Sequence, residues 1–314
     1  MIHFITALFL LSFSFYSHAS NFFEKFSATK ISQHVYVIHG PLQQPNPENK
    51  GFMNNPAFIV ADKSVIIVDP GSSQDTAIML MREIKKITDK PVSHIFNTHI
   101  HGDHWLGNDA IKSAYPEAII YADPRMIKKA RNGEAEQWRD LLKKLTKGAT
   151  AGTKIAYPGK STKDSDQLLL AGLNFNIHSV GIGHSDSDIM IELVEDSLMF
   201  TGDNVGYKRI LRMDDGSFRD MIAACDRAIG LQLKHYVPGH GSTGDVSIIK
   251  LQKEYLSTLY KMVAKYYEEG LEDFEMKPMI VKALKKFQSW GGFEEQLGKH
   301  ISLAVLEVEK AEFE

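Results

Sequence analysis

The sequence contains a single cysteine, no excess of basic residues and only one long apolar run, at its beginning. Cys225 cannot form an internal disulfide, so the fold must be stable through its core, in which we expect this thiol to be buried. The formal net charge of -3 leaves no excess positive charge for binding nucleic acid. Because 43% of the 314 residues are hydrophobic, the composition indicates an ordinary globular protein with a substantial core.

The apolar run extends from Phe4 to Tyr16 and is shorter than the roughly 20 residues that a membrane-spanning helix needs. Ser17 and Ala19 follow it in the small-x-small pattern of a signal-peptide cleavage site. We therefore expect residues 1–19 to be a secretory signal peptide cleaved after Ala19, although no Lys or Arg precedes the run. An uncleaved anchor or a buried helix is the alternative. The mature protein is expected to be periplasmic or secreted, with no stable membrane insertion.

Strand-like and helix-like segments follow one another in an order that occurs twice. The first set comprises three strands, a helix and a further strand, at residues 34–40, 57–61, 64–69, 73–87 and 94–97. The second set comprises two strands, a helix and a strand, at residues 189–194, 197–203, 219–230 and 235–241. In this repeat Asp69 corresponds to Asp203, and the loop with His99 and His101 corresponds to the one with His240. The repeat predicts two sheets that face each other with helices outside.

Four further segments complete the chain. Residues 123–145 are helix-patterned, and the Gly-, Thr-, Ser- and Lys-rich connection at 147–166 is expected on the surface. The polar segment 41–55 has the composition of a mobile flap. Residues 245–314 are almost wholly helical in pattern, with helices expected at 251–267, 277–287 and 297–313.

The segment NTHIHGDHWLGN places several chemically active side chains close together. His99 and His101 are two residues apart, so in an extended loop they project to the same side and can hold one metal ion. Asp103 and His104 can then reach a second ion. Three further candidates follow strand-like segments and are flanked by glycine, which lets the backbone approach an ion closely: His184, Asp203 and His240.

The motifs THIHGDH, GHS, TGD and PGHG, in this order at loop ends, resemble the metallo-β-lactamase superfamily of hydrolases over roughly residues 31–241. The resemblance implies an α/β fold, a four-layer αβ/βα sandwich with the site along one edge and a C-terminal helical extension. It implies a first zinc site of three histidines, a second site of three residues and a bridging aspartate: His99, His101 and His184; Asp103, His104 and His240; and Asp203.

The expected organisation is a signal peptide at 1–19, a hydrolase domain at 20–244 and a helical extension at 245–314 packed on the same domain. The extension resembles that of exported quinoprotein-associated and sulfur-oxidation-linked zinc metallohydrolases, through YLSTLYKMV and LGKHISLAVLEVE. Asp203 resembles the bridging aspartate of glyoxalase II-type enzymes, esterases and thioesterases, whereas true lactamases carry cysteine or serine near this place. The resemblance therefore favours an ester, thioester or related acyl bond over a β-lactam.

The expected cofactors are two zinc ions, with iron or manganese as alternatives. Two divalent ions joined by a carboxylate lower the pKa of a bridging water toward about 7, which generates hydroxide where bulk water would not. Asp103 is the predicted catalytic residue, because it is placed to orient this nucleophile toward a small-molecule substrate. Three alternatives stay open: a β-lactamase, a mononuclear iron persulfide dioxygenase-like oxidoreductase, and a non-catalytic periplasmic binding protein.

Other residues near the motifs have predicted supporting roles. Asp69 and Asp188 are expected either to hydrogen-bond ligand histidines or to fill capping and turn roles. Trp105 is expected to pack beneath the metal loop. An exposed charged loop follows Asp203 and either contacts an anionic substrate or has no specific role: Tyr207, Lys208 and Arg209.

Overall fold

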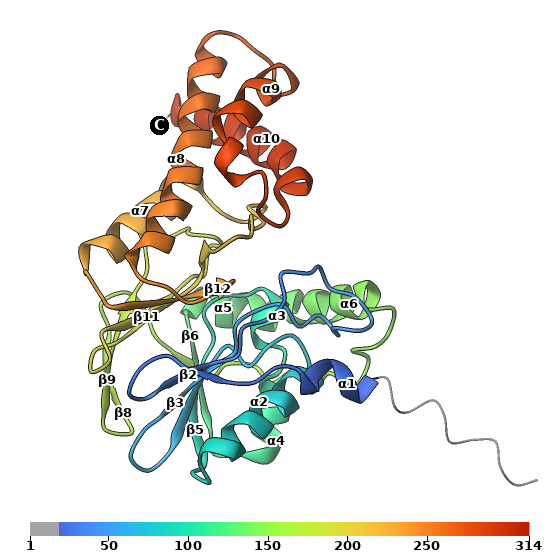
Figure 1. Ribbon diagram of the computed structural model, residues 1–314, viewed down its shortest axis with the longest axis vertical. Helices are drawn as coiled ribbons and strands as arrows, with labels where there is room; N and C mark the ends of the chain where they lie inside the picture. The colour runs from blue at the N-terminus through green and yellow to red at the C-terminus, as the bar shows by residue number, and fades with distance from the viewer. Residues whose placement is uncertain (1–18, 314) are drawn as a thin grey trace, which may run out of the picture.

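The computed structural model describes residues 19–313, which form two β-sheets packed face to face with helices on both outer surfaces (Figure 1). The predicted signal peptide lies outside the described residues apart from Ala19, which begins the short helix α1 (Ala19–Glu24). Within the described range, no helix is both long and apolar enough to cross a membrane.

The first sheet has seven strands, which pair in the order in which they occur along the chain. The strands are β1 (Thr29–Lys30), β2 (Val35–Val37), β3 (Ala57–Val60), β4 (Val65–Val68), β5 (Val92–Phe96), β6 (Ile119–Ala122) and β7 (Lys160–Ser161). Strands β1 to β4 pair antiparallel, and β5, β6 and β7 each add in parallel. Every residue of β4 is buried, as expected for a strand that is covered on both faces.

The second sheet has five strands in the order β12, β11, β10, β9, β8. Their bounds are β8 (Gln167–Leu170), β9 (Leu173–His178), β10 (Met190–Leu193), β11 (Leu198–Gly206) and β12 (His235–His240). All pairs are antiparallel except β11 with β12.

The predicted repeat is present in the fold. In the first sheet β3 pairs antiparallel with β4, a helix follows, and β5 pairs parallel with β4. In the second sheet β10, β11, a helix and β12 repeat this arrangement. Because both units carry their helix on the outer face, the two sheets meet through their inner faces. The structure thus confirms the four-layer α/β sandwich.

Apolar residues fill the spaces between these layers. The two inner faces meet at residues such as Phe96, Phe175 and Phe200. Helices α2 (Gln74–Ile87) and α4 (Asn108–Ala114) cover the first sheet. The second sheet is covered by α7 (Phe218–Gly230) and by α8 (Val246–Glu268), and Cys225 is buried there as expected.

Residues 123–145 are helical as predicted, but the stretch is divided into separate helices. Helix α5 (Pro124–Lys129) leads into the π-helical turn η1 (Ala130–Glu134) and then into α6 (Ala135–Leu145). Gly133 has φ of 106°, a left-handed conformation that an α-helix does not accommodate. The break matters for function because α6 forms one wall of the pocket described below.

The C-terminal helices stand at one end of the molecule against α7 (Figure 1). They are α8, α9 (Asp273–Ala283), the 3-10 turn η2 (Lys285–Phe287) and α10 (Phe293–Ala311). Their apolar cluster includes Phe218 and Met221 of α7. Glu307 of α10 also accepts hydrogen bonds from the backbone N–H groups of Phe218 at 2.8 Å and Arg219 at 3.0 Å, at the start of α7. The capping of α7 thus adds to the packing of α8 on the second sheet in holding the tail to the sandwich.

Replacing Glu307 with Ala should destabilise the protein, because two N–H groups at the start of α7 lose their acceptor. We expect a loss of about 1–2 kcal/mol in the free energy of unfolding, the usual cost of removing a helix cap. Urea denaturation at neutral pH measures this change. The exposed Glu309 provides the control, since Glu309→Ala removes the same charge from the same helix; equal stabilities of the two variants would contradict the capping role.

Candidate metal centre

Seven buried histidine and aspartate side chains lie together at the edge of the sandwich where β5 and β12 end. The loop after β5 supplies His99 and His101, and the short helix α3 (Gly102–Trp105) supplies Asp103 and His104. The second sheet supplies the others: His184 after β9, Asp203 in β11 and His240 at the end of β12. Both halves of the repeat thus contribute to one site, as the sequence predicts.

The seven residues form two groups. Each residue offers one atom that could bind a metal ion, and within a group these atoms all lie within 4.8 Å of one another. The first group is His99, His101, His184 and Asp203, and the second is Asp103, His104 and His240.

Asp203 lies between the two groups. One carboxylate oxygen, Oδ2, is 3.5 Å from Nε2 of His184 and 3.2 Å from Nε2 of His240. The other oxygen is 3.2 Å from Nε2 of His104. Because its carboxylate touches histidines of both groups, Asp203 occupies the position that a bridging ligand requires.

Four of the five histidines have one ring nitrogen held by a neighbour, which turns the other nitrogen toward the centre. The pairs are His99 Nδ1 with Thr98 Oγ1 at 2.9 Å, His101 Nε2 with Asp215 at 3.1 Å, His104 Nδ1 with Asp69 at 2.8 Å, and His240 Nδ1 with the Met53 carbonyl at 2.8 Å. Partners of this kind set the orientation and tautomer of histidines that ligate metal ions.

Several atoms that face the centre have no hydrogen-bond partner among the described residues. They include Nε2 of His99, Oδ2 of Asp103 and Oδ1 of Asp203, all fully enclosed. The two carboxylate oxygens form ion pairs with neighbouring imidazoles, at 3.3 Å to His240 and 3.2 Å to His104, but no hydrogen bond of good geometry. Leaving buried polar atoms unpaired is costly, whereas a cation at the centre would satisfy these three together. Imidazole nitrogens with carboxylate oxygens form a donor set that suits zinc and related ions. The two groups therefore fit a divalent metal site.

The two groups differ in the proton affinity of their histidines. Burial lowers the pKa of His99 well below its ordinary value and lowers that of His184 to about 3, so both rings are neutral. Burial would also lower the pKa of His104 and His240. There the aspartates outweigh burial, chiefly Asp203, and raise the pKa of both rings.

The acidic partners are held as carboxylates by the same interactions. Burial would raise the pKa of Asp103 and Asp203, but the neighbouring His104 and His240 outweigh burial and lower both. Both side chains therefore offer anionic oxygens to a cation.

The two candidate supporting aspartates have different roles. Asp69 is a partner of His104, and it also accepts hydrogen bonds from the backbone N–H of Thr98 at 2.9 Å and from its hydroxyl at 2.7 Å. Its φ of 50° is unusual for a residue with a side chain, as occurs at functional sites. Asp188 instead accepts the backbone N–H of Ser185 at 2.6 Å, which is the turn role.

Close packing fixes the ligand loops. Trp105 is fully buried as expected, and its Nε1–H donates to the carbonyl of Ile100 at 2.8 Å. A Cβ at position 239 would overlap the Asp203 carboxylate, so Gly239 is required for β12 to pass this close to it.

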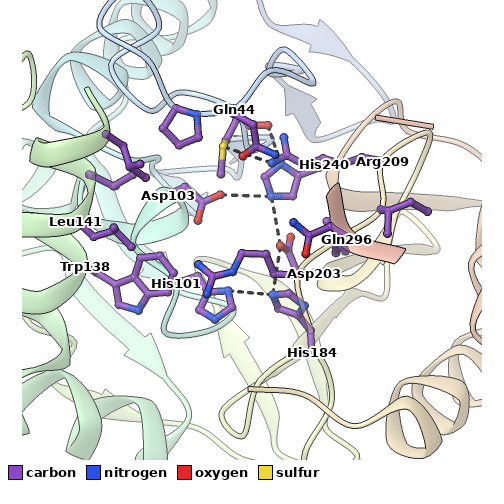
Figure 2. A pocket seen from close by; sticks show the side chains of 17 residues that line it. Gln44, His101, Asp103, Trp138, Leu141, His184, Asp203, Arg209, His240 and Gln296 are labelled. Atoms are coloured by element: carbon purple, nitrogen blue, oxygen red, sulfur yellow. Dashed lines mark hydrogen bonds and ion pairs between the residues drawn. The ribbon is translucent and has the colours of Figure 1, made fainter. Parts of the chain in front are cut away.

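A pocket with about 600 Å³ of empty space, part of it open to solvent, lies over the centre (Figure 2). Trp138 and Leu141 of α6 lie on one side of the candidate ligands, and Arg209 and Gln296 lie on the other. Arg209 corrects an expectation: it is only 6% exposed and lines the pocket, whereas the sequence suggested an exposed loop. Lys208 is exposed, as expected.

The segment predicted as a flap contributes Gln44, Pro45 and Met53 to the pocket lining. Its later part is anchored, because Phe52 packs in the core and the Asn55 amide donates to the carbonyl of Pro238 at 2.8 Å. The exposed residues of the segment lie in its earlier part, at 42–44 and 47–48.

Three residues of the site carried no motif that sequence analysis could have used. Asp215 lies beside His101, and the Trp138 ring lies 4.7 Å from the His101 ring, measured between centroids. Gln296 reaches the pocket from α10. Trp138 and Gln296 stand in helices whose periodicity indicates only packing, and Asp215 stands in an ordinary turn.

The sequence matches the metallo-beta-lactamase superfamily over residues 49–240, a range that contains all seven candidate ligands. The chain belongs to this superfamily. This assignment confirms the family resemblance of the motifs and, together with the buried His/Asp clusters, indicates a metal-dependent hydrolase.

Curated relatives agree with this assignment. A probable metallo-hydrolase of Streptococcus pyogenes is 27% identical over 192 residues, which cover 60% of this chain and 78% of the relative. A probable metallo-hydrolase of Methanocaldococcus jannaschii is 27% identical over 207 residues, which cover 62% of this chain and 91% of the relative. A linear primary-alkylsulfatase of a Pseudomonas strain is 23% identical over 70% of this chain, which spans only 48% of that protein.

Solved structures show the same fold. A metallo-beta-lactamase from Pontibacter korlensis superposes with a TM-score of 0.59 at 18% identity, over 74% of this chain and 99% of the other. One from Hirschia baltica gives a TM-score of 0.52 at 18% identity, over 74% and 97% of the two chains.

Replacing Asp69 with Asn should weaken the second group, because His104 loses the carboxylate that orients its ring. We expect the affinity for the ion at this group to fall by about 10–100-fold, the usual effect of removing an outer-shell partner. Titration with a competing chelator measures it. Asp62→Asn, at an exposed position, is the matched control. Unchanged affinity in Asp69→Asn would show that Asp69 serves only the backbone of Thr98.

The pKa directions predict that acid releases metal from the two groups in sequence. Raised pKa values mean that His104 and His240 bind protons more readily, so a falling pH competes with metal there first. The lowered pKa values of His99 and His184 keep these two rings neutral to lower pH. Metal content after dialysis from pH 8 to about pH 5 should therefore fall at the second group first, while the first group keeps its ion. Release of both ions in one step would contradict this order.

Proposed function

We propose that this protein is a dinuclear zinc hydrolase that cleaves an ester, thioester or related acyl bond of a small molecule. One observation carries the proposal: Asp203 lies between two separate ligand groups, with an oxygen 3.5 Å from His184 and 3.2 Å from His240. A carboxylate between two dications lowers the electrostatic cost of holding them close together.

Each group has a defined set of candidate ligands. His99, His101 and His184 would hold the first ion. Asp103, His104 and His240 would hold the second, and Asp203 would contact both. Zinc is proposed because three histidines form a typical catalytic zinc site, while iron and manganese suit the same donors.

When bound by these residues, divalent ions would supply hydroxide at neutral pH and would polarise the carbonyl of the substrate. The protein's own part is to place and protect these reactants. Asp103 is ionised and buried, so it can accept a hydrogen bond from the nucleophile and orient it. Trp138 and Leu141 shield one side of the pocket from water, which strengthens the electrostatic interactions within it.

The substrate class rests on the bridging aspartate. Asp203 resembles the aspartate of glyoxalase II-type enzymes and many esterases, and this supports acyl esters over β-lactams. The likeness to solved lactamases at 18% identity concerns the fold. The name of the Pseudomonas relative identifies a hydrolase of alkyl sulfate esters, so a screen should include sulfate esters beside acyl esters, thioesters and cephalosporins.

The apolar run and the Ser17-His18-Ala19 pattern support export, and we propose that the mature chain starts at Ser20 and acts in the periplasm or outside the cell. Amino-terminal sequencing of the native protein tests this proposal. An intact chain starting at Met1 in a soluble cytoplasmic fraction would contradict it.

Asp203→Ala should lose the second metal preferentially, because the first keeps three histidine ligands. We expect one metal per chain, and turnover of any ester found by the screen should fall by more than tenfold. Metal analysis and hydrolysis rates on the same preparation measure both effects. Asp62→Ala controls for the loss of an exposed carboxylate. Two metals with unchanged rates in Asp203→Ala would exclude bridging and favour the lactamase alternative.

A further inference from the structure

Arg209 is a buried cation for which no carboxylate partner is provided. It is 6% exposed, and none of the ion pairs found among residues 19–313 includes it. Its guanidinium has only two protein partners, the carbonyl of Gln43 at 3.4 Å and the sulfur of Met53 at 3.6 Å. The contact with Gln43 is long for an N–H···O bond, which is typically 2.7–3.2 Å, and the thioether sulfur of Met53 is only a weak acceptor. Much of its hydrogen-bonding capacity is therefore unused inside the pocket.

Gln296 is a second underused polar group in the same pocket. Its side chain is buried, with the residue 8% exposed, and Oε1 has no hydrogen-bond partner among the described residues. The amide carries a donor and an acceptor, and rotation about its last bond exchanges them. A buried unpaired amide is costly unless a ligand satisfies it.

The backbone brings these two side chains together. The N–H of Ile210 donates to the carbonyl of Gly291 at 2.8 Å, and the N–H of Gly291 donates to the carbonyl of Lys208 at 2.9 Å. These bonds attach the start of α10, which carries Gln296, to the segment that carries Arg209. The C-terminal extension thus completes one side of the pocket.

The opposite side is built by α6 and is largely apolar: Trp138, Leu141, Leu142 and Leu145. Arg212 also lines the pocket here, but its guanidinium lies over the Trp138 ring, 5.6 Å from the ring centre, and is already paired with Asp214 at 2.8 Å. Figure 2 shows Trp138 and Leu141 facing Gln296 across the candidate metal ligands. A ligand that fills this pocket would therefore meet an unpaired cation and an amide at one end, and at the other end mainly hydrocarbon, where the cation already has a carboxylate partner.

We propose that Arg209 and Gln296 form a subsite for an anionic group of the substrate, a carboxylate or a sulfate, while α6 contacts its apolar part. Arg209 binds such a group through paired N–H donors, the geometry that a guanidinium offers to planar or tetrahedral oxyanions. Burial lowers the pKa of Arg209, and the charges of Asp103 and Asp203 oppose this shift. Neither carboxylate forms an ion pair with Arg209, because both contact the candidate ligand His240 instead. The subsite rests on the proposed function and narrows its substrate to amphiphilic anions.

The test compares two aryl esters that differ in one charge, 4-nitrophenyl butyrate and the mono-4-nitrophenyl ester of glutaric acid, with the full-length zinc-loaded protein. Arg209→Met should reduce the ratio of their kcat/KM values, anionic over neutral, by about 10–100-fold, as expected for a lost charge-assisted hydrogen bond. Gln296→Leu should reduce it by a smaller factor. Lys208→Met removes the same charge from the exposed neighbouring position and should leave the ratio unchanged.

Calorimetry with hexanoate, hexyl sulfate and 1-hexanol supplies a readout that needs no turnover. In Arg209→Met the protein's affinity for one or both anions should fall relative to its affinity for 1-hexanol. The anion whose affinity falls more identifies which group, carboxylate or sulfate, the subsite prefers. Arg209-dependent anion binding without hydrolysis of any ester would leave the subsite standing and remove the proposed function. Unchanged ratios in both Arg209→Met and Gln296→Leu, by kinetics and by calorimetry, would overturn the subsite.

Discussion

The structure depends on the convergence of five histidines and two aspartates in a space from which water is largely excluded. In the absence of a cation this arrangement is unfavourable, since several inward-facing atoms have no hydrogen-bond partner and the aspartates raise the proton affinity of His104 and His240. The fold tolerates this cost because outer partners such as Asp69 and Asp215 lock the rings in place. The arrangement of these side chains therefore favours a bound cation whether or not a substrate is present.

The duplicated unit explains why the two halves of the chain meet at this place. Strands β5 and β12 occupy equivalent positions in the repeat, and each ends at the site, with His99 just after one and His240 at the end of the other. The sandwich brings these ends together because the two sheets pack through their inner faces. The C-terminal extension covers part of the second sheet through α8, which contributes Ile248 and Ile249 to the core there. It contacts α7 through its apolar cluster and reaches the pocket through Gln296.

Much of this arrangement could be predicted from the sequence, because the signals for it lie in short contiguous segments. The ligands follow strands of branched apolar residues and stand beside glycines, so their motifs and their elements were both visible. The burial of Arg209 could not be predicted, because it depends on the docking of residues 291–296, which lie far along the chain. The short strands β1 and β7 also escaped prediction, since pairings of two residues leave no periodicity in the sequence. The break at Gly133 was not predicted either. Asp215 approaches His101 only through tertiary packing.

Crystallography of protein purified without chelators, with anomalous data collected on both sides of the zinc absorption edge, tests the dinuclear zinc assignment most directly. The account predicts two zinc peaks, one within ligand distance of His99, His101 and His184 and one within ligand distance of Asp103, His104 and His240. The Asp203 carboxylate should contact both peaks. A single peak, or an absorption edge that belongs to iron, would contradict the account and favour mononuclear oxidoreductase chemistry on the same ligands.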